Sequence, residues 1–165
     1  MIELIVLDVD GTLTDGKITY TSTGEELKSF DVADGLAIAV WTKKFGKKAA
    51  IITGRNSSIV ERRAKELNIT HLHQGIKNKQ EVLEEILKQE GLNWSQVAAI
   101  GDDLNDYNML KKVGLSFTPA NGTHYLKEFV NVVCKNKGGE GAVREMLEYI
   151  FKEDGLEEEF LNAWL

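Results

Sequence analysis

The chain has 165 residues, one cysteine and a formal net charge of −6. This length suffices for one domain with a sizeable core, and the acidic balance argues against nucleic acid or an anionic membrane as the main partner. The single cysteine, Cys134, cannot form an intrachain disulfide, which favours a reducing compartment. No apolar stretch reaches membrane-spanning length, and Met1 leads directly into an expected strand with no signal peptide. We therefore expect a cytoplasmic protein.

Short apolar runs that alternate with amphipathic segments predict an α/β fold with a doubly wound, mainly parallel sheet. In chain order, strands are expected at residues 3–8, 48–54, 71–75, 97–101, 115–117 and 130–133. Helices are expected at residues 36–41, 59–67, 77–90, 107–112, 125–129 and 142–151, the first of them opened by Asp34 and Gly35. A further amphipathic turn or two is expected within residues 156–165. No repeat or linker divides the chain, so we expect residues 1–165 to form one domain.

A β-hairpin is predicted directly after the first strand. Residues 17–20 and 26–30 alternate polar and apolar side chains, and residues 21–25 between them are typical of a turn. Because an isolated hairpin is only marginally stable, this one should pack on something, such as another subunit.

Two carboxylates, Asp8 and Asp10, follow the first strand. Side chains alternate along an extended chain, so both point the same way, at the edge of the sheet where open α/β folds bind ligands. Two such charges about 4 Å apart repel by roughly 4 kcal/mol at an effective dielectric near 20. A cation bound there, or a chemical role for the carboxylates, would explain the pairing.

Other polar groups follow later strands and should reach the same edge. They are Thr53 and Gly54, Lys79, and the pair Asp102 and Asp103. Carboxylates without a histidine or cysteine partner favour Mg²⁺ over zinc, and a hydroxyl, a glycine amide and a lysine can hold a phosphate. This combination indicates phosphoryl transfer, in which one carboxylate attacks phosphorus and a second moves a proton.

Four motifs in this order resemble those of the haloacid dehalogenase superfamily of phosphohydrolases. They are residues 8–14, Thr53 after an apolar strand, a downstream lysine, and residues 101–106. Residues 15–35, 52–55, 74–79 and 138–145 further resemble the phosphatases of 3-deoxy-D-manno-octulosonate 8-phosphate (KDO 8-phosphate), and this closer resemblance extends to about Phe151.

The resemblance implies a role for each matching residue. Asp8 would be the nucleophile and a Mg²⁺ ligand, and Asp10 the general acid and base, with its backbone carbonyl on the metal. Thr53 and Gly54 would hold the phosphate, Lys79 would neutralise it, and Asp102 would complete the protein ligands of Mg²⁺.

The same resemblance implies three supporting roles and an assembly. Asp103 and Asp106 would orient the waters of the metal or Lys79. Arg55 and Arg63 would face the carboxylate of the sugar acid. Members without a cap domain form homotetramers, in which the hairpin at about residues 17–30 and a neighbour's tail, about residues 138–165, close the site.

Several alternatives remain open at this point. Residues 104–107 and 121–124 depart from the family pattern, so the substrate could instead be a nonulosonate 9-phosphate. A phospho-receiver or a regulatory phosphatase-like module is the non-enzymatic reading, which the Asp-x-Asp-Gly order at residues 8–11 disfavours. Asp103 and Asp106 also suit the start of a helix, and Lys77 rather than Lys79 is the lysine expected to be solvated.

Overall fold

The sheet is organised around β1 (Leu4–Leu7), whose side chains are all buried. This computed structural model describes residues 1–165. The other strands of the sheet are β4 (Lys48–Ile52), β5 (His71–His73), β6 (Val97–Ile100), β7 (Leu115–Thr118) and β8 (Val132–Val133). They lie in the order β5-β4-β1-β6-β7-β8 and pair only in parallel, which confirms the predicted doubly wound sheet. The chain passes from β1 to β4 on one side and to β6 on the other, so a topological switch point lies at the end of β1.

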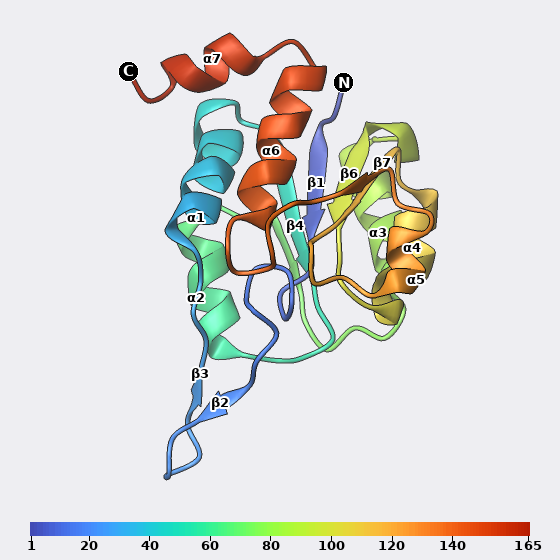
Figure 1. Cartoon of the computed structure of the whole chain (residues 1–165). Helices are drawn as coiled ribbons and strands as arrows, with labels where there is room; N and C mark the ends of the chain where they lie inside the picture. Colours follow the sequence, from blue (N-terminus) through green and yellow to red (C-terminus); the bar gives the residue numbers. More distant parts are fainter.

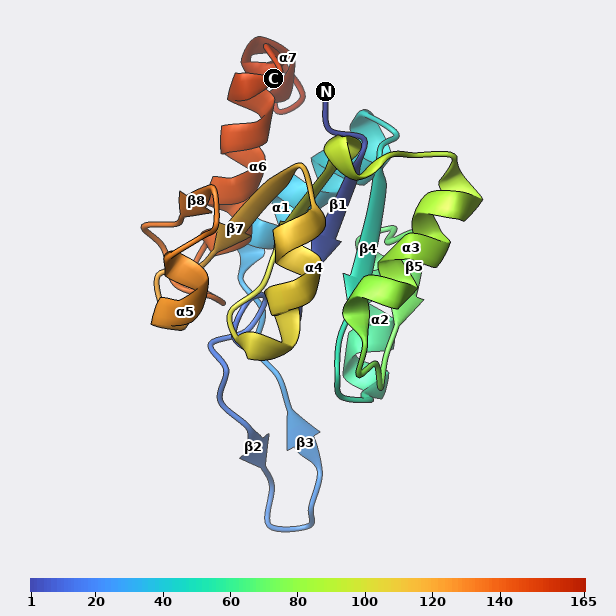
Figure 2. The same cartoon turned by 90° about the vertical axis from the view of Figure 1, so that its right-hand side faces the viewer.

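Helices cover both faces of this sheet (Figures 1 and 2). The helices are α1 (Val32–Ala39), α2 (Ser58–Glu66), α3 (Lys79–Glu90), α4 (Tyr107–Lys112), α5 (His124–Lys127), α6 (Ala142–Glu153) and α7 (Glu157–Asn162). One core packs α1, α2 and α6 against the sheet, and the other packs α3, α4 and α5. Alternate residues of β1 enter the two cores, as the twofold periodicity of a strand requires. None of the helices is both long enough and apolar enough to cross a membrane.

The predicted hairpin is present, with shorter strands than expected. β2 (Thr19–Tyr20) pairs antiparallel with β3 (Glu26–Leu27), and the two project from the body of the molecule (Figure 2). The C-terminal helix α7 lies at the opposite end of the molecule (Figure 1). Within one chain, α7 therefore lies far from the hairpin.

Two helix starts differ from the prediction. α1 begins at Val32 rather than at Asp34, because the side chain of Asp31 accepts a hydrogen bond from the Asp34 backbone N–H and caps the helix. The Asp34 carboxylate is instead buried and accepts a hydrogen bond from the backbone N–H of Arg144 at the start of α6, at 2.9 Å. α3 begins at Lys79 rather than residue 77, since Asn78 provides its cap.

A glycine loop before α6 packs directly on the loop after β1. The N–H of Gly139 donates to the carbonyl of Thr12 at 3.1 Å. A Cβ at position 138 would lie 2.0 Å from the carbonyl oxygen of Gly11, so only glycine allows this approach. The glycine loop that leads into α6 therefore holds the loop at the carboxyl end of β1 in place.

Gly138→Ala should destabilise the protein by about 2–3 kcal/mol, because an added methyl group would force the two loops apart. Gly155→Ala is the matched control: its φ of +72° is unfavourable for alanine, but no atom lies within 4 Å of the added carbon. The control should cost only about 1 kcal/mol. Urea unfolding of both variants measures the difference, and equal losses would contradict the close packing.

Candidate active site

A cavity of about 280 Å³ lies at the carboxyl edge of the sheet. It is lined by Asp8, Asp10, Gly16, Thr53, Gly54, Arg55, Asp102, Asp103 and Asn105. These residues follow β1, β4 and β6, so the parallel sheet brings together side chains that are about a hundred residues apart in sequence. The lining contains no hydrophobic residue, which suits a small, strongly polar ligand.

A buried ion-pair cluster forms the floor of this cavity. The ammonium of Lys79 lies 2.8 Å from Asp8 Oδ1 and 2.6 Å from Asp106 Oδ1. The side chains of Lys79 and Asp106 are 1% and 0% exposed. Lys79, the first residue of α3, is therefore the lysine at the active-site carboxylates, whereas Lys77 is exposed.

Burial dominates the electrostatics of the cluster. Burial raises the pKa of Asp8 to about 7, although the nearby Lys79 ammonium opposes the increase. Burial and the charge of Asp8 raise the pKa of Asp106 to about 6, again against the effect of Lys79. Burial would lower the pKa of Lys79, but the two carboxylates outweigh it and raise that pKa. The lysine therefore stays charged, while its partners hold protons more readily than ordinary carboxyls.

The carboxylates form an oxygen-rich site that fits a divalent cation. Ligand oxygens of Asp8, Asp102 and Asp106 lie within 4.8 Å of one another. Asp106 is already committed, because its Oδ1 bonds Lys79 and its Oδ2 accepts the backbone N–H of Asp102 at 3.0 Å. This leaves Asp8 and Asp102 as the side chains free to bind a cation, and an all-oxygen donor set suits Mg²⁺. Burial also raises the pKa of the Asp102 carboxyl.

The opposite wall of the cavity is suited to an anion. Thr53 is buried, and it directly follows the last residue of β4. The N–H of Gly54 donates to no backbone carbonyl, so it remains available to a ligand. Arg55 also lines the cavity, and its guanidinium bonds Glu26 of the hairpin at 3.2 Å.

Asp10 is held by a residue that the sequence did not indicate. The ammonium of Lys28, at the base of the hairpin, lies 2.6 Å from Asp10 Oδ1 and 3.2 Å from Glu26 Oε1. Burial disfavours the charge on Lys28, but both carboxylates bond to it and raise its pKa. Lysine is common on exposed hairpins, so the sequence does not distinguish Lys28 from other lysines. Its contacts with Asp10 and Glu26 in the folded chain do.

Two more residues missed by the sequence analysis shape the loops around the cavity. The hydroxyl of Thr12 donates to Asp102 Oδ1 at 3.2 Å. The side-chain amide of Asn121 donates to the Gly11 carbonyl at 3.0 Å and accepts the Gly138 N–H at 2.7 Å. Both contacts join segments that are distant in sequence, so neither has a local signal.

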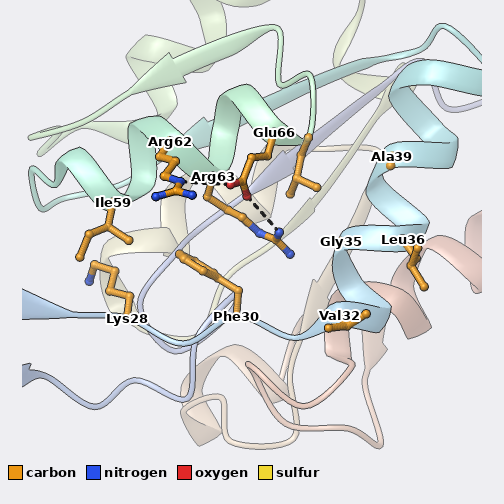
Figure 3. Close-up of a pocket in the computed structure, with 11 residues that line it drawn as sticks. Lys28, Phe30, Val32, Gly35, Leu36, Ala39, Ile59, Arg62, Arg63 and Glu66 are labelled. Atoms are coloured by element: carbon orange, nitrogen blue, oxygen red, sulfur yellow. Dashed lines mark hydrogen bonds and ion pairs between the residues drawn. The ribbon is translucent and has the colours of Figure 1, made fainter.

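The remaining predicted site residues occupy different places. Asp103 lines the cavity, but its carboxylate accepts the N–H of Leu104 and caps the following turn. Arg63 lies outside the cavity, in a neighbouring groove of about 610 Å³ between α1, α2 and the hairpin base (Figure 3). There its guanidinium bonds Glu66 and the Asp31 carbonyl and lies over the ring of Phe30.

Comparisons with known proteins place the chain among hydrolases of one family. Residues 72–147 match the family of haloacid dehalogenase-like hydrolases. The chain is 41% identical over 155 residues to the 3-deoxy-D-manno-octulosonate 8-phosphate phosphatase of Escherichia coli, covering 93% of this chain and 81% of that protein. It is 42% identical over 149 residues to the protein of the same name from Yersinia pestis, covering 90% and 79%.

Solved structures of such phosphatases are also similar to this chain. The phosphatase of the same name from Moraxella catarrhalis, in complex with magnesium, phosphate and KDO, matches with a TM-score of 0.95 and 40% identity, covering 99% of this chain and 94% of that one. The cobalt-bound form of a deoxy-D-mannose-octulosonate 8-phosphate phosphatase from Haemophilus influenzae matches with a TM-score of 0.89 and 37% identity, covering 94% and 91%.

Lys79→Met should lower the free energy of unfolding by about 3 kcal/mol in metal-free buffer near pH 8, because it leaves buried carboxylates without their cation. Carboxyls with pKa values raised to about 7 and about 6 in the folded chain stabilise the fold at low pH and lose that contribution as pH rises through these values. The loss should therefore shrink near pH 5, where both carry protons.

Lys77→Met is the matched control, since Lys77 is exposed two residues away. It should change stability by less than about 0.5 kcal/mol at either pH. Chemical unfolding with EDTA at both pH values measures these effects, and a pH-independent loss in Lys79→Met would contradict the electrostatic account.

Proposed function

The chain belongs to the haloacid dehalogenase-like hydrolases and, among them, to the family of KDO 8-phosphate phosphatases, and we propose that it hydrolyses KDO 8-phosphate to KDO and inorganic phosphate with Mg²⁺. The observation that carries this proposal is the cavity floor. A buried carboxylate, Asp8, lies against a buried ammonium at the floor of an all-polar cavity, in a chain with this fold and these relatives.

The proposed reaction has two steps. In the first, a carboxylate oxygen of Asp8 bonds to phosphorus, the bond between phosphorus and the sugar oxygen breaks, and Asp10 gives that oxygen its proton. In the second, Asp10 takes a proton from water, the water oxygen bonds to phosphorus, and Asp8 is released as a carboxylate. The products are the sugar acid and inorganic phosphate.

The charges around Asp8 serve both steps. Asp8, Asp102 and the Asp10 carbonyl would hold Mg²⁺, which when bound would supply positive charge to the phosphoryl group. Lys79 fixes the Asp8 side chain and neutralises the phosphate, while Thr53 and Gly54 donate to its oxygens. Asp106 orients Lys79, a role supported by their 2.6 Å contact. Asp103 would act only through the turn that it caps.

The two arginines are proposed to recognise the sugar acid. Arg55 lies in the cavity wall, and Arg63 lies in the adjoining groove. A substrate with a carboxylate far from its phosphate could contact both regions. A nonulosonate 9-phosphate has the same groups, so it is the alternative substrate.

A stable phospho-receiver is the less favoured alternative. The position of Asp10 beside the cavity argues against it, because a general base there would hydrolyse an aspartyl-phosphate.

We also infer that the chain acts as one domain and assembles as a homotetramer. Side chains on the hairpin and on α1 are apolar and exposed: Ile18, Tyr20, Leu27, Val32 and Leu36. Such a surface is typical of a subunit contact. The last helix of the tail, α7, lies at the opposite end of the molecule from the hairpin and cannot cover its own cavity, so it could close only the site of another subunit. A cytoplasmic location is proposed from the buried free thiol of Cys134.

The substrate proposal is tested by measuring kcat/KM on KDO 8-phosphate, a nonulosonate 9-phosphate and glucose 6-phosphate, each with Mg²⁺ and with EDTA. We expect KDO 8-phosphate to be preferred, with activity only in Mg²⁺. A preference for the nonulosonate 9-phosphate would show that this compound is the substrate instead.

Asp8→Asn should release no phosphate while keeping the wild-type fold, because the amide cannot attack phosphorus. Turnover by this variant would refute the mechanism.

Mg²⁺ affinity should rise with pH up to about 7. Burial raises the pKa of Asp8 to about 7 in the absence of a cation, so below this pH the ion must displace a proton. Calorimetric titration between about pH 5.5 and about pH 8.5 should show roughly tenfold weaker binding per unit below pH 7 and little change above it. An affinity that is constant over this range would contradict the assignment of Asp8 as a ligand.

The assembly is tested by light scattering on the purified chain. A tetramer is expected, and the double variant Tyr20→Asp, Leu27→Asp should dissociate because it places charges on the apolar face of the hairpin. A fully active wild-type monomer would contradict the inferred assembly.

A further inference from the structure

We propose that Lys28 is a positioning residue for proton transfer, holding the Asp10 carboxyl from the base of the hairpin so that its second oxygen faces the leaving oxygen of the substrate. This inference rests on the phosphatase activity proposed above. It assigns to the hairpin a part in the chemistry of its own subunit, beyond assembly.

The contact between Lys28 and Asp10 is short and largely shielded from solvent. The ammonium lies 2.6 Å from Asp10 Oδ1, and the side chain of Lys28 is only 2% exposed. Exposed ion pairs contribute little, but one shielded from water holds its partners more firmly. Asp10 itself is 23% exposed and lines the cavity. One of its oxygens is therefore anchored, and the other is open to a ligand.

Lys28 is the only basic residue that forms an ion pair with Asp10. Lys79 is committed to Asp8 and Asp106 at 2.8 and 2.6 Å. Without Lys28, Asp10 would be a carboxyl beside Asp8 and Asp102 with no positive partner. Repulsion would then favour orientations that turn it away from the cavity.

The position of Lys28 is itself fixed by a row of alternating charges. Its ammonium lies 3.2 Å from Glu26 Oε1, and the same oxygen lies 3.2 Å from Arg55 Nη2. The row runs from Arg55 in the cavity wall, through two residues of the hairpin, to Asp10. The stem of Lys28 lies beside Phe30 and Ile59 in the groove next to the cavity (Figure 3). The hairpin base is thus tied to both walls of the cavity.

This role predicts a dependence on the leaving group. An alkyl oxygen needs a proton as it leaves, whereas p-nitrophenolate leaves readily without one. The later hydrolysis of the aspartyl-phosphate also uses Asp10, is common to both substrates and enters kcat, whereas kcat/KM reports only the steps up to departure of the leaving group. A residue that positions the proton donor should therefore matter for kcat/KM on KDO 8-phosphate and hardly at all for kcat/KM on p-nitrophenyl phosphate.

The test compares kcat/KM and kcat of Lys28→Met on these two substrates. We expect kcat/KM on KDO 8-phosphate to fall about 10- to 100-fold, part of the roughly 10²–10⁴-fold that a general acid supplies, and kcat/KM on p-nitrophenyl phosphate to fall less than about threefold. Lys28→Arg keeps the charge and should recover part of the lost rate. Glu26→Gln should show a smaller loss with the same bias toward KDO 8-phosphate.

Lys17→Met is the matched control, because Lys17 is an exposed lysine on the same hairpin. It should leave both activities unchanged. Equal losses of kcat/KM on the two substrates in Lys28→Met would overturn the proposal in favour of a structural role, and a raised KM with unchanged kcat on KDO 8-phosphate would overturn it in favour of substrate binding. Wild-type protein inactive on both substrates would instead refute the proposed function.

Discussion

The site depends on the ammonium of Lys79, which is buried between two carboxylates. Burying Asp8 and Asp106 side by side is unfavourable, and the pKa values of about 7 and about 6 record that cost even with the lysine in place. This repulsion favours binding of a divalent cation, whose positive charge offsets both the carboxylates and a phosphate bound beside them. Asp106 accepts hydrogen bonds from the Lys79 ammonium with one oxygen and from the Asp102 backbone N–H with the other. Since Lys79 also bonds Asp8, its ammonium links the loop after β1 to the loop after β6.

The fold fixes the positions of the loops around this cluster. The parallel sheet sets where each loop starts, and the glycine loop before α6 holds the loop after β1 from outside, with Gly138 against Gly11. Asn121 bonds both of these loops. The hairpin completes the arrangement through Lys28, so a segment that projects into solvent is nevertheless joined to the centre of the site.

Much of the fold and part of the site could be predicted from the sequence. Apolar runs located the strands, their parallel pairing followed from the alternation with helices, and the sheet, the family and the hairpin are confirmed. The placement of Asp8 and Asp102 at one cavity followed from strand ends alone. The start of α1 was wrong, because Asp31 and Asp34 are equally good caps by type and only tertiary burial of Asp34 decides between them. Lys28 and Asn121 could not be identified, since their partners lie in distant segments.

The most direct test of this account is to look for phosphate on Asp8 itself. The variant Asp10→Asn should form the aspartyl-phosphate slowly and hydrolyse it more slowly still, because the amide cannot take a proton from water. After mixing with KDO 8-phosphate and Mg²⁺ and quenching in acid, peptide mass spectrometry should find one phosphoryl group on Asp8. Asp8 that stays unmodified while phosphate is released, or phosphate found on another residue, would contradict the central claim.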